Sequence, residues 1–150
     1  MYELHYYTRP SLCLGGRQFI GVDTEAARDG DIARLQYPSA LLEVDSCLHI
    51  DYQLIGEVRL EVGYQLDQQS DVRHLLCTLV PNSTHIGWFS ADILLQAGRY
   101  QLYFDAVILS LQERPLVALD SIKLLDENCT RISFTGKSSQ AFYMCFVLQL

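Results

Sequence analysis

The sequence has little basic charge and no long apolar run. Its 150 residues include 11 lysines and arginines against 18 aspartates and glutamates, a formal net charge of −7. An acidic surface repels phosphate backbones, so this balance argues against nucleic-acid binding. No apolar stretch reaches the roughly 18 residues of a membrane span, so we expect no insertion into a membrane. We expect the apolar residues 141–148 to form a buried strand.

Catalytic signatures are also missing. The sequence contains no H-E-x-x-H, no G-x-S-x-G, no phosphate-binding loop and no dinucleotide fingerprint. The one Cys/His combination to consider is His74 with Cys77, and their spacing along a strand predicts that they lie on opposite faces. We therefore predict no enzymatic activity, no catalytic residue and no cofactor.

Metal-binding patterns are weak. The five cysteines are too far apart in sequence for a zinc site. Acidic residues cluster at 23–31 and 67–71, and loop carboxylates of this kind can bind calcium. Solvated loop acids are the simpler interpretation, so no metal site is predicted. We expect His49 to be a surface residue on the polar face of its strand rather than a ligand.

The dominant pattern is an alternation of apolar and polar residues with a period of two, typical of antiparallel strands with one solvated face. Only residues 24–34 show a helical pattern, which Gly30 interrupts. Gly56 separates two alternating stretches and predicts a hairpin between them. We expect a single all-β domain, a two-sheet antiparallel sandwich. The expected strands are residues 47–55, 57–66, 100–108 and 116–125, with weaker candidates at 17–22, 32–37, 72–80, 132–134 and 141–148.

Asp120 is out of place in its strand. By parity it shares a face with Leu116, Ala118, Ile122 and Leu124. Because a buried carboxylate must be paired, hydrogen-bonded or protonated, we expect Asp120 to lie near a strand end or a bulge, where backbone N–H groups or an arginine can reach it.

Three segments in order resemble the MAM domain, an extracellular module named for meprins, a neuropilin and a receptor tyrosine phosphatase. They are GDIARLQYPSALLEVDSCLHIDYQLIGEVRLEV, GWFSADILLQAGRYQLYFDAVI and PLVALDSIKLLDENC. The resemblance covers about residues 18–129. Ile50 stands where the family has an aromatic residue, Asp105 replaces glutamate and Ser121 replaces an aspartate. The matching positions are Ala33, Leu35, Pro38, Cys47, Leu48, Tyr52, Trp88, 98–106 and 118–129.

The resemblance implies a jelly-roll fold and a disulfide between Cys47 and Cys129. Such a bridge closes a loop of about 80 residues and would stabilise the fold by roughly 4–5 kcal/mol. Cys13, Cys77 and Cys145 are then left over. Pairing of Cys13 with Cys145 would tie the termini together, while Cys77 could be a plain buried thiol. The sequon at Asn82 follows a proline in an expected turn and is the glycosylation candidate.

The resemblance further implies a non-catalytic extracellular module that recognises other proteins, including further copies of itself, in adhesion or receptor assembly. It would belong to a larger secreted or membrane-anchored protein. One alternative is a glycan-binding jelly roll, which an exposed Trp88 or Tyr64 beside Asp or Asn would favour. Another is an accessory domain of a secreted protease, as in meprins. No signal peptide is visible at the start, so a cytosolic protein and a fragment of a longer chain both remain open.

Overall fold

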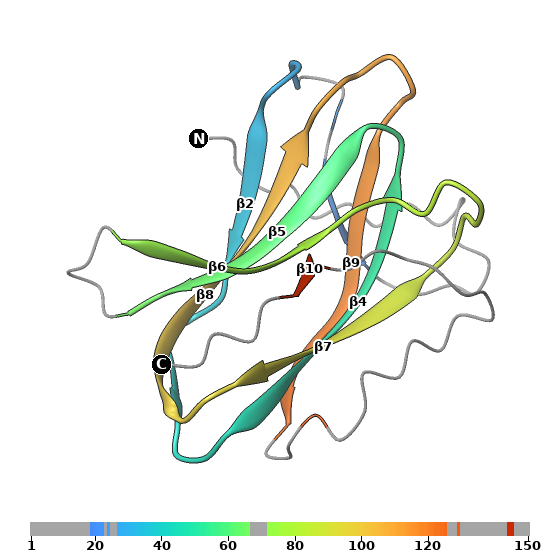
Figure 1. Cartoon of the computed structure of the whole chain (residues 1–150). Coiled ribbons are helices and arrows are strands. Elements are labelled where there is room, and N and C mark those ends of the chain that lie inside the picture. Colours follow the sequence, from blue (N-terminus) through green and yellow to red (C-terminus); the bar gives the residue numbers. More distant parts are fainter. Residues whose placement is uncertain are drawn as a thin grey trace.

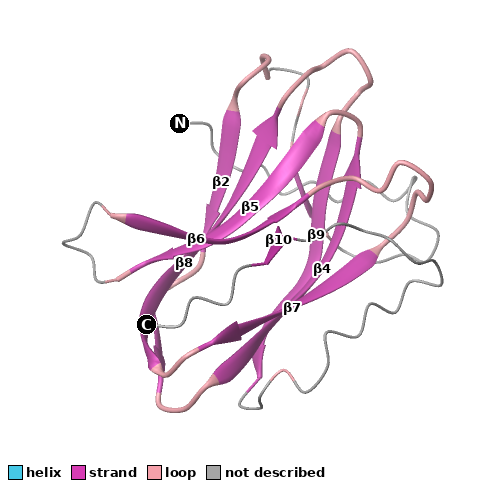
Figure 2. Cartoon of the chain, viewed as in Figure 1, coloured by secondary structure: helices cyan, strands magenta, loops and turns pink. Residues whose placement is uncertain are grey.

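The computed structural model describes residues 19–22, 24, 27–66, 72–125, 129 and 144–145. Every regular element in this part of the chain is a β-strand (Figure 2), and it contains no helix long and apolar enough to cross a membrane. The strands are β1 (Ile20–Gly21), β2 (Ile32–Gln36), β3 (Ala40–Leu42), β4 (Ser46–Ile55), β5 (Val58–Gln65), β6 (Arg73–Leu79), β7 (Phe89–Leu95), β8 (Gly98–Ile108), β9 (Leu116–Leu125) and β10 (Met144–Cys145).

The strands form two antiparallel sheets that pack as a sandwich (Figure 1). One is four-stranded, with the order β1-β9-β4-β7. The other is six-stranded and runs β10-β6-β5-β8-β2, with β3 also pairing with β8. This confirms the predicted all-β sandwich and is consistent with a jelly roll.

Alternating apolar residues from both sheets fill the space between them. Strands β4 and β5 bury mainly the face that points into the core, as the predicted alternation requires. Strand β8 alternates in the same way but buries Tyr103, Asp105 and Val107 on its outer face as well. Burial of the inner face is the main driving force for packing the sheets. The core side chains of these strands are Leu48, Ile50, Tyr52 and Leu54, then Val58, Leu60, Val62 and Tyr64, then Leu102, Phe104, Ala106 and Ile108.

Gly56 makes a turn, but the predicted hairpin is wrong. Strand β4 pairs with β7 and β9, whereas β5 pairs with β6 and β8, so the chain crosses from one sheet to the other at this turn. Gly56 has φ of 78°, and an added Cβ would lie 3.2 Å from Cα of Pro115. The error has a simple cause: strands that face each other across a core alternate in the same way as strands side by side.

The helical pattern at 24–34 is also wrong for its described residues. Residues 29 and 30 form a turn and β2 begins at Ile32. Sequence reasoning also missed β3 and β7, although Ala91, Ile93 and Leu95 of β7 alternate and are buried. Of the weaker candidates, 132–134 lies outside the described residues, and 141–148 contains β10.

Asp120 is the extra residue of a β-bulge, which confirms the expected position of this residue at a bulge. Along β4, Asp51 is opposite Ser121 and Tyr52 is opposite Leu119, so the ladder steps over Asp120. The bulge also reverses the alternation of β9. The predicted common face of Leu116, Ala118, Ile122 and Leu124 is therefore wrong, because the core side chains are Val117 and Leu119 before the bulge and Ile122 and Leu124 after it.

Candidate functional site

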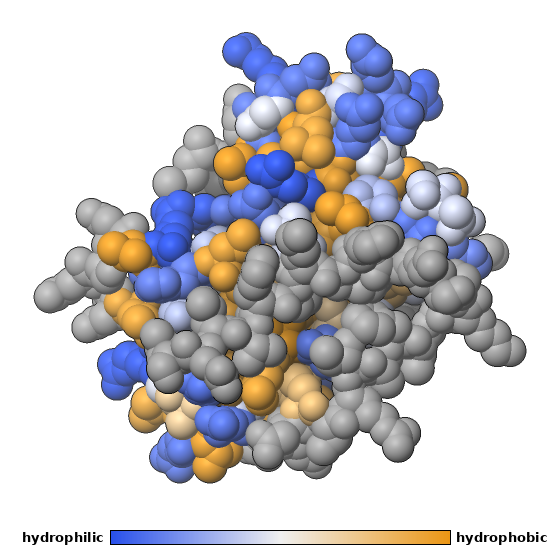
Figure 3. Space-filling view, viewed as in Figure 1, coloured by the Kyte–Doolittle hydropathy of each residue, from blue (hydrophilic) through white to orange (hydrophobic). Residues whose placement is uncertain are grey.

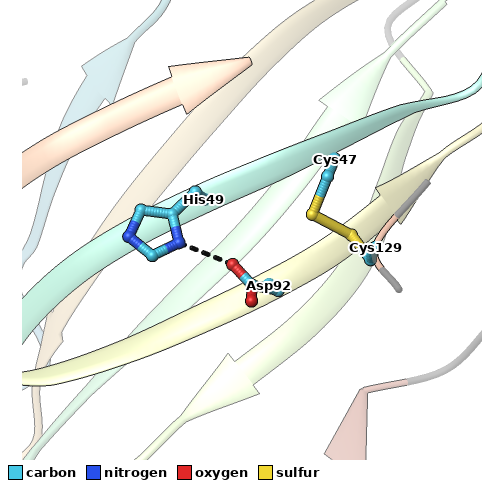
Figure 4. Close-up of a disulfide and its surroundings, with 4 residues drawn as sticks. All are labelled: Cys47, His49, Asp92 and Cys129. Carbon is cyan, nitrogen blue, oxygen red and sulfur yellow. Dashed lines mark hydrogen bonds and ion pairs between the residues drawn. A yellow bond between two sulfur atoms is a disulfide. The ribbon is translucent and has the colours of Figure 1, made fainter. Parts of the chain in front are cut away.

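A disulfide joins the first part of β4 to the chain that follows β9. Cys47 and Cys129 have an S–S distance of 2.05 Å and a Cα–Cα distance of 5.1 Å, and they are 82 residues apart in sequence (Figure 4). The pairing implied by the family resemblance is confirmed. Because Leu125 of β9 lies opposite Cys47, the bridge reinforces the end of the β4–β9 ladder.

The outer face of the four-stranded sheet presents three rows of side chains across β7, β4 and β9. The strand register, with Leu48 and Ile50 directed into the core, places these residues on the opposite side of the sheet. We call this surface the three-row face. Its rows are Leu94–Cys47–Leu125, Asp92–His49–Lys123 and Ser90–Asp51–Ser121.

Hydrogen bonds fix the polar part of the three-row face. His49 Nδ1 lies 2.6 Å from Asp92 Oδ1 (Figure 4), and its Nε2 lies 3.3 Å from Asp51 Oδ1. The hydroxyl of Ser90 donates to Asp51. His49 is thus on the polar face, as predicted, but it is half-buried and bonded between two carboxylates. Since the serine hydroxyl bonds a carboxylate rather than the imidazole, these groups are not ordered as nucleophile and base.

The outer face of the six-stranded sheet contains an ion pair that the sequence did not reveal. Arg34 of β2 binds Asp105 of β8 through two nitrogens, with Nε 2.6 Å from Oδ1. The hydrogen bond that Arg34 donates to Asp105 raises the pKa of Arg34. The same guanidinium lies 5.0 Å from the ring centre of Tyr103, and Arg73 approaches that ring at 5.9 Å.

Tyr103 is buried although it points away from the core. It is 7% exposed, and its hydroxyl donates to the backbone oxygen of His74. Burial raises the pKa of this phenol, and the charge of Asp105 adds to the shift. The cluster links β2, β6 and β8 and so helps to hold the sheet together.

Of the two aromatic residues that could favour a sugar site, Tyr64 is buried and Trp88 is partly exposed. Tyr64 is 6% exposed and lies between His74, stacked at 4.9 Å, and the edge of Tyr100 at 5.1 Å. Trp88 is half-buried and meets the ring of Phe19 edge-on at 6.0 Å. Stacking of a sugar requires an exposed ring face, which Tyr64 does not offer.

His74 and Cys77 lie on the same side of β6, contrary to the prediction. The ladder pairs Val62 with Cys77 and then Tyr64 with His74, with a bulge between. Because Val62 and Tyr64 both face the core, the extra residue of the bulge brings His74 to that side as well. Simple alternation could not show this.

Loop acids at one end of the sandwich bind backbone amides. Asp29 accepts a hydrogen bond from the amide of Leu111 at 2.9 Å, and Asp31 accepts one from Arg28 at 2.8 Å. Figure 3 shows hydrophilic residues over the uppermost part of the molecule. The described residues contain no group of three or more His, Cys, Asp or Glu arranged to hold a metal ion. The second acidic cluster, 67–71, lies outside them.

The sequon at Asn82 lies in the connection between β6 and β7. Its side-chain oxygen accepts hydrogen bonds from the amide of Thr84 at 2.9 Å and from the hydroxyl of Thr84 at 2.8 Å. Ser83 and Thr84 are exposed. The loop therefore presents the sequon at the surface.

Comparison with known proteins gives one family. The model of the MAM domain (meprin/A5/mu) matches residues 5–130, so the similarity begins nearer the N-terminus than the expected residue 18. No curated protein matches the chain. MAM domains occur in extracellular regions and are generally non-catalytic. A match over most of the chain, together with the sandwich and its Cys47–Cys129 bridge, shows that this chain belongs to the MAM domain family.

Proposed function

We propose that this chain is a non-catalytic extracellular module that binds another protein, and that a second copy of the chain is its partner. The family match over residues 5–130 carries the first part of the proposal. The Cys47–Cys129 disulfide supports an oxidising location, because disulfides persist outside the cytosol. The three-row face supports the second part.

The three-row face is self-complementary in charge. Asp92 on β7 and Lys123 on β9 lie on either side of His49 in one row. A two-fold axis in the plane of contact and parallel to β4 places β9 of one copy over β7 of the other. Lys123 of each copy then faces Asp92 of the other copy, so both charges gain an opposite partner.

The same axis pairs the apolar row with itself. Leu94 is 40% exposed and Leu125 is 42% exposed, and they lie on either side of Cys47. In the dimer Leu125 of one copy covers Leu94 of the other. Apolar contact beside charged pairs is the usual composition of a protein interface. The strands and the disulfide hold these side chains in place, which reduces the entropy cost of binding.

A pair of charge reversals tests this arrangement. Asp92→Lys makes both ends of the charged row basic, and Lys123→Asp makes both ends acidic. We expect each variant alone to lose self-association, because like charges then meet across the axis. An equimolar mixture of the two variants should associate, because acidic rows then meet basic rows. Sedimentation velocity over a range of concentrations measures both results, and added salt should weaken the association.

Matched controls make the same charge changes elsewhere. Glu113→Lys and Arg99→Asp alter exposed residues outside the three-row face and should leave association unchanged. A wild-type chain that stays monomeric at all concentrations would overturn the proposal of a second copy. Association that is unchanged in both reversal variants would overturn the choice of this face. Binding of the monomer to a glycan array would favour the lectin alternative instead.

We also propose that Asn82 carries an N-linked glycan. The support is the sequon in the β6–β7 connection, where Ser83 and Thr84 are exposed and Thr84 donates hydrogen bonds to the half-buried Asn82 side chain. Chain secreted by eukaryotic cells should lose mass on enzymatic release of N-glycans, and Asn82→Gln should remove that loss. An unchanged mass after release in the wild type would contradict this assignment.

A further inference from the structure

The C-terminal strand places two cysteines opposite each other. Strand β10 pairs antiparallel with β6, with Met144 opposite Thr78 and Cys145 opposite Cys77 (Figure 1). Directly opposed residues in an antiparallel ladder have Cα atoms roughly 4.5–5.5 Å apart. Disulfides form over Cα separations of about 4.4–6.8 Å. The Cys47–Cys129 bridge of this chain, at 5.1 Å, lies in the same range.

The register also places positions 77 and 145 on one face of the sheet. Opposed residues of an antiparallel pair share a face. Cys77 is 1% exposed and belongs to the core. Strand β6 lies between β10 and β5, and on the β5 side Cys77 is opposite Val62. The register places position 145 opposite this core residue, on the edge strand of the six-stranded sheet.

We propose that Cys77 and Cys145 form a second disulfide that fastens β10 to β6. The oxidant is a low-molecular-weight disulfide, such as oxidised glutathione. The thiolate of one cysteine attacks it, giving a mixed disulfide and releasing one small thiol. The thiolate of the other cysteine then attacks the mixed disulfide, forming the protein S–S bond and releasing a second small thiol. Two protein thiols are oxidised and one small disulfide is reduced, with the two protein protons ending on the small thiols.

The burial of Cys77 fixes when this exchange takes place. A small disulfide cannot reach a side chain that is 1% exposed, so the exchange accompanies the docking of β10 on β6 during folding. The bond then lies in the core, where external reductants do not reach it. It also joins residue 145, beyond the family match that ends at residue 130, to the sandwich.

This pairing leaves Cys13 as the remaining thiol of the five cysteines. The alternatives are a bond between Cys13 and Cys145 and the absence of any second disulfide. Counting thiols distinguishes the absence of a second disulfide from the proposal. Mapping the linked peptides distinguishes a bond between Cys13 and Cys145 from it.

The test uses the full chain secreted into oxidising medium, unfolded without reduction, alkylated and analysed by mass spectrometry. We expect one alkylated thiol, at Cys13, and a non-reduced peptide that links residues 77 and 145. In Cys13→Ser no thiol should be alkylated. Three alkylated thiols in the wild type, at positions 13, 77 and 145, would overturn the proposal. So would a peptide linking residues 13 and 145 together with alkylated Cys77.

A second measurement keeps the test decisive if Cys13 forms disulfides between chains. The Cys13→Ser chain, refolded in a buffer of reduced and oxidised glutathione, contains four cysteines and should yield only the 47–129 and 77–145 linkages. Two alkylated thiols, at 77 and 145, would overturn the proposal in this chain as well. Neither result depends on whether the protein associates. Failure of this proposal can therefore be distinguished from failure of the proposed function.

Discussion

Tyr103 lies against the backbone of β5 because residue 63 has no side chain. A Cβ at Gly63 would overlap the phenol of Tyr103 and lie 2.5 Å from the backbone oxygen of His74. We predict that Gly63→Ala destabilises the fold by about 1–3 kcal/mol, because either the buried ring or the β5–β6 ladder must shift. Urea unfolding of the variant and the wild type measures the loss.

Gly87→Ala is the matched control for this substitution. Among the described residues, the only atom within 4 Å of an added Cβ there is His85 Cδ2 at 3.9 Å, an ordinary contact. We expect its stability to lie within about 0.5 kcal/mol of the wild type. Equal midpoints for the two alanine variants would contradict the role given to Gly63.

Alkaline pH should destabilise the chain through its buried tyrosines. Burial raises the pKa of Tyr103 and of Tyr100, whereas tyrosines in the unfolded chain ionise near pH 10. Above that pH the unfolded state loses protons that the folded state retains, so stability falls as pH rises. The contribution of these tyrosines to stability is fully present below about pH 10. It is lost as the pH rises through their raised pKa values in the folded state.

Tyr103→Phe provides the check on this pH dependence. The variant loses the hydrogen bond to His74 and should be less stable at neutral pH, but its stability should fall less steeply above about pH 10. Urea midpoints across the alkaline range measure the two slopes. Parallel curves for the variant and the wild type would show that Tyr103 does not contribute.

At the scale of the strand, alternation identified most strands but not their interruptions. The bulges at Asp120 in β9 and between β5 and β6 each add one residue and reverse the faces that follow. An extra residue changes no local propensity, so the sequence offers only an indirect sign, such as the carboxylate of Asp120 on an apolar face. That sign located one bulge correctly and left the other, near Cys77, unseen.

Deletion of the bulge residue should be tolerated far better than deletion of its neighbours. Without Asp120, Ser121 still lies opposite Asp51 and Leu119 opposite Tyr52, so each side chain keeps its face. We expect a cost of about 1–2 kcal/mol. Deletion of Lys123 instead shifts the residues after it by one position and reverses their faces, which should prevent folding. Secretion yield and circular dichroism compare the two, and equal effects would contradict this account.

At the scale of the molecule, local pattern could not assign strands to sheets. The hairpin error at Gly56 came from this limit, since β4 and β5 contribute to one core from opposite sides. Arg34 and Asp105 are 71 residues apart, so their pairing depends on the β2–β8 register, which no local window contains. Cys47 and Cys129 are just as remote, and only the resemblance to a known family predicted their bond.

The Cys47–Cys129 bridge should supply a large share of the stability. It joins residues 82 apart, and cross-linking a loop of that length restricts the unfolded chain by roughly 4–5 kcal/mol. We predict that Cys47→Ser/Cys129→Ser loses about this much in urea unfolding, with a steeper dependence on urea because the unfolded chain becomes more expanded. The double variant is the right comparison, since either single variant leaves a thiol that can form other bonds. The loss should also weaken self-association, because Cys47 lies between Leu94 and Leu125 of the three-row face. A loss below about 1 kcal/mol would mean that the packed sheets, rather than the bridge, determine stability.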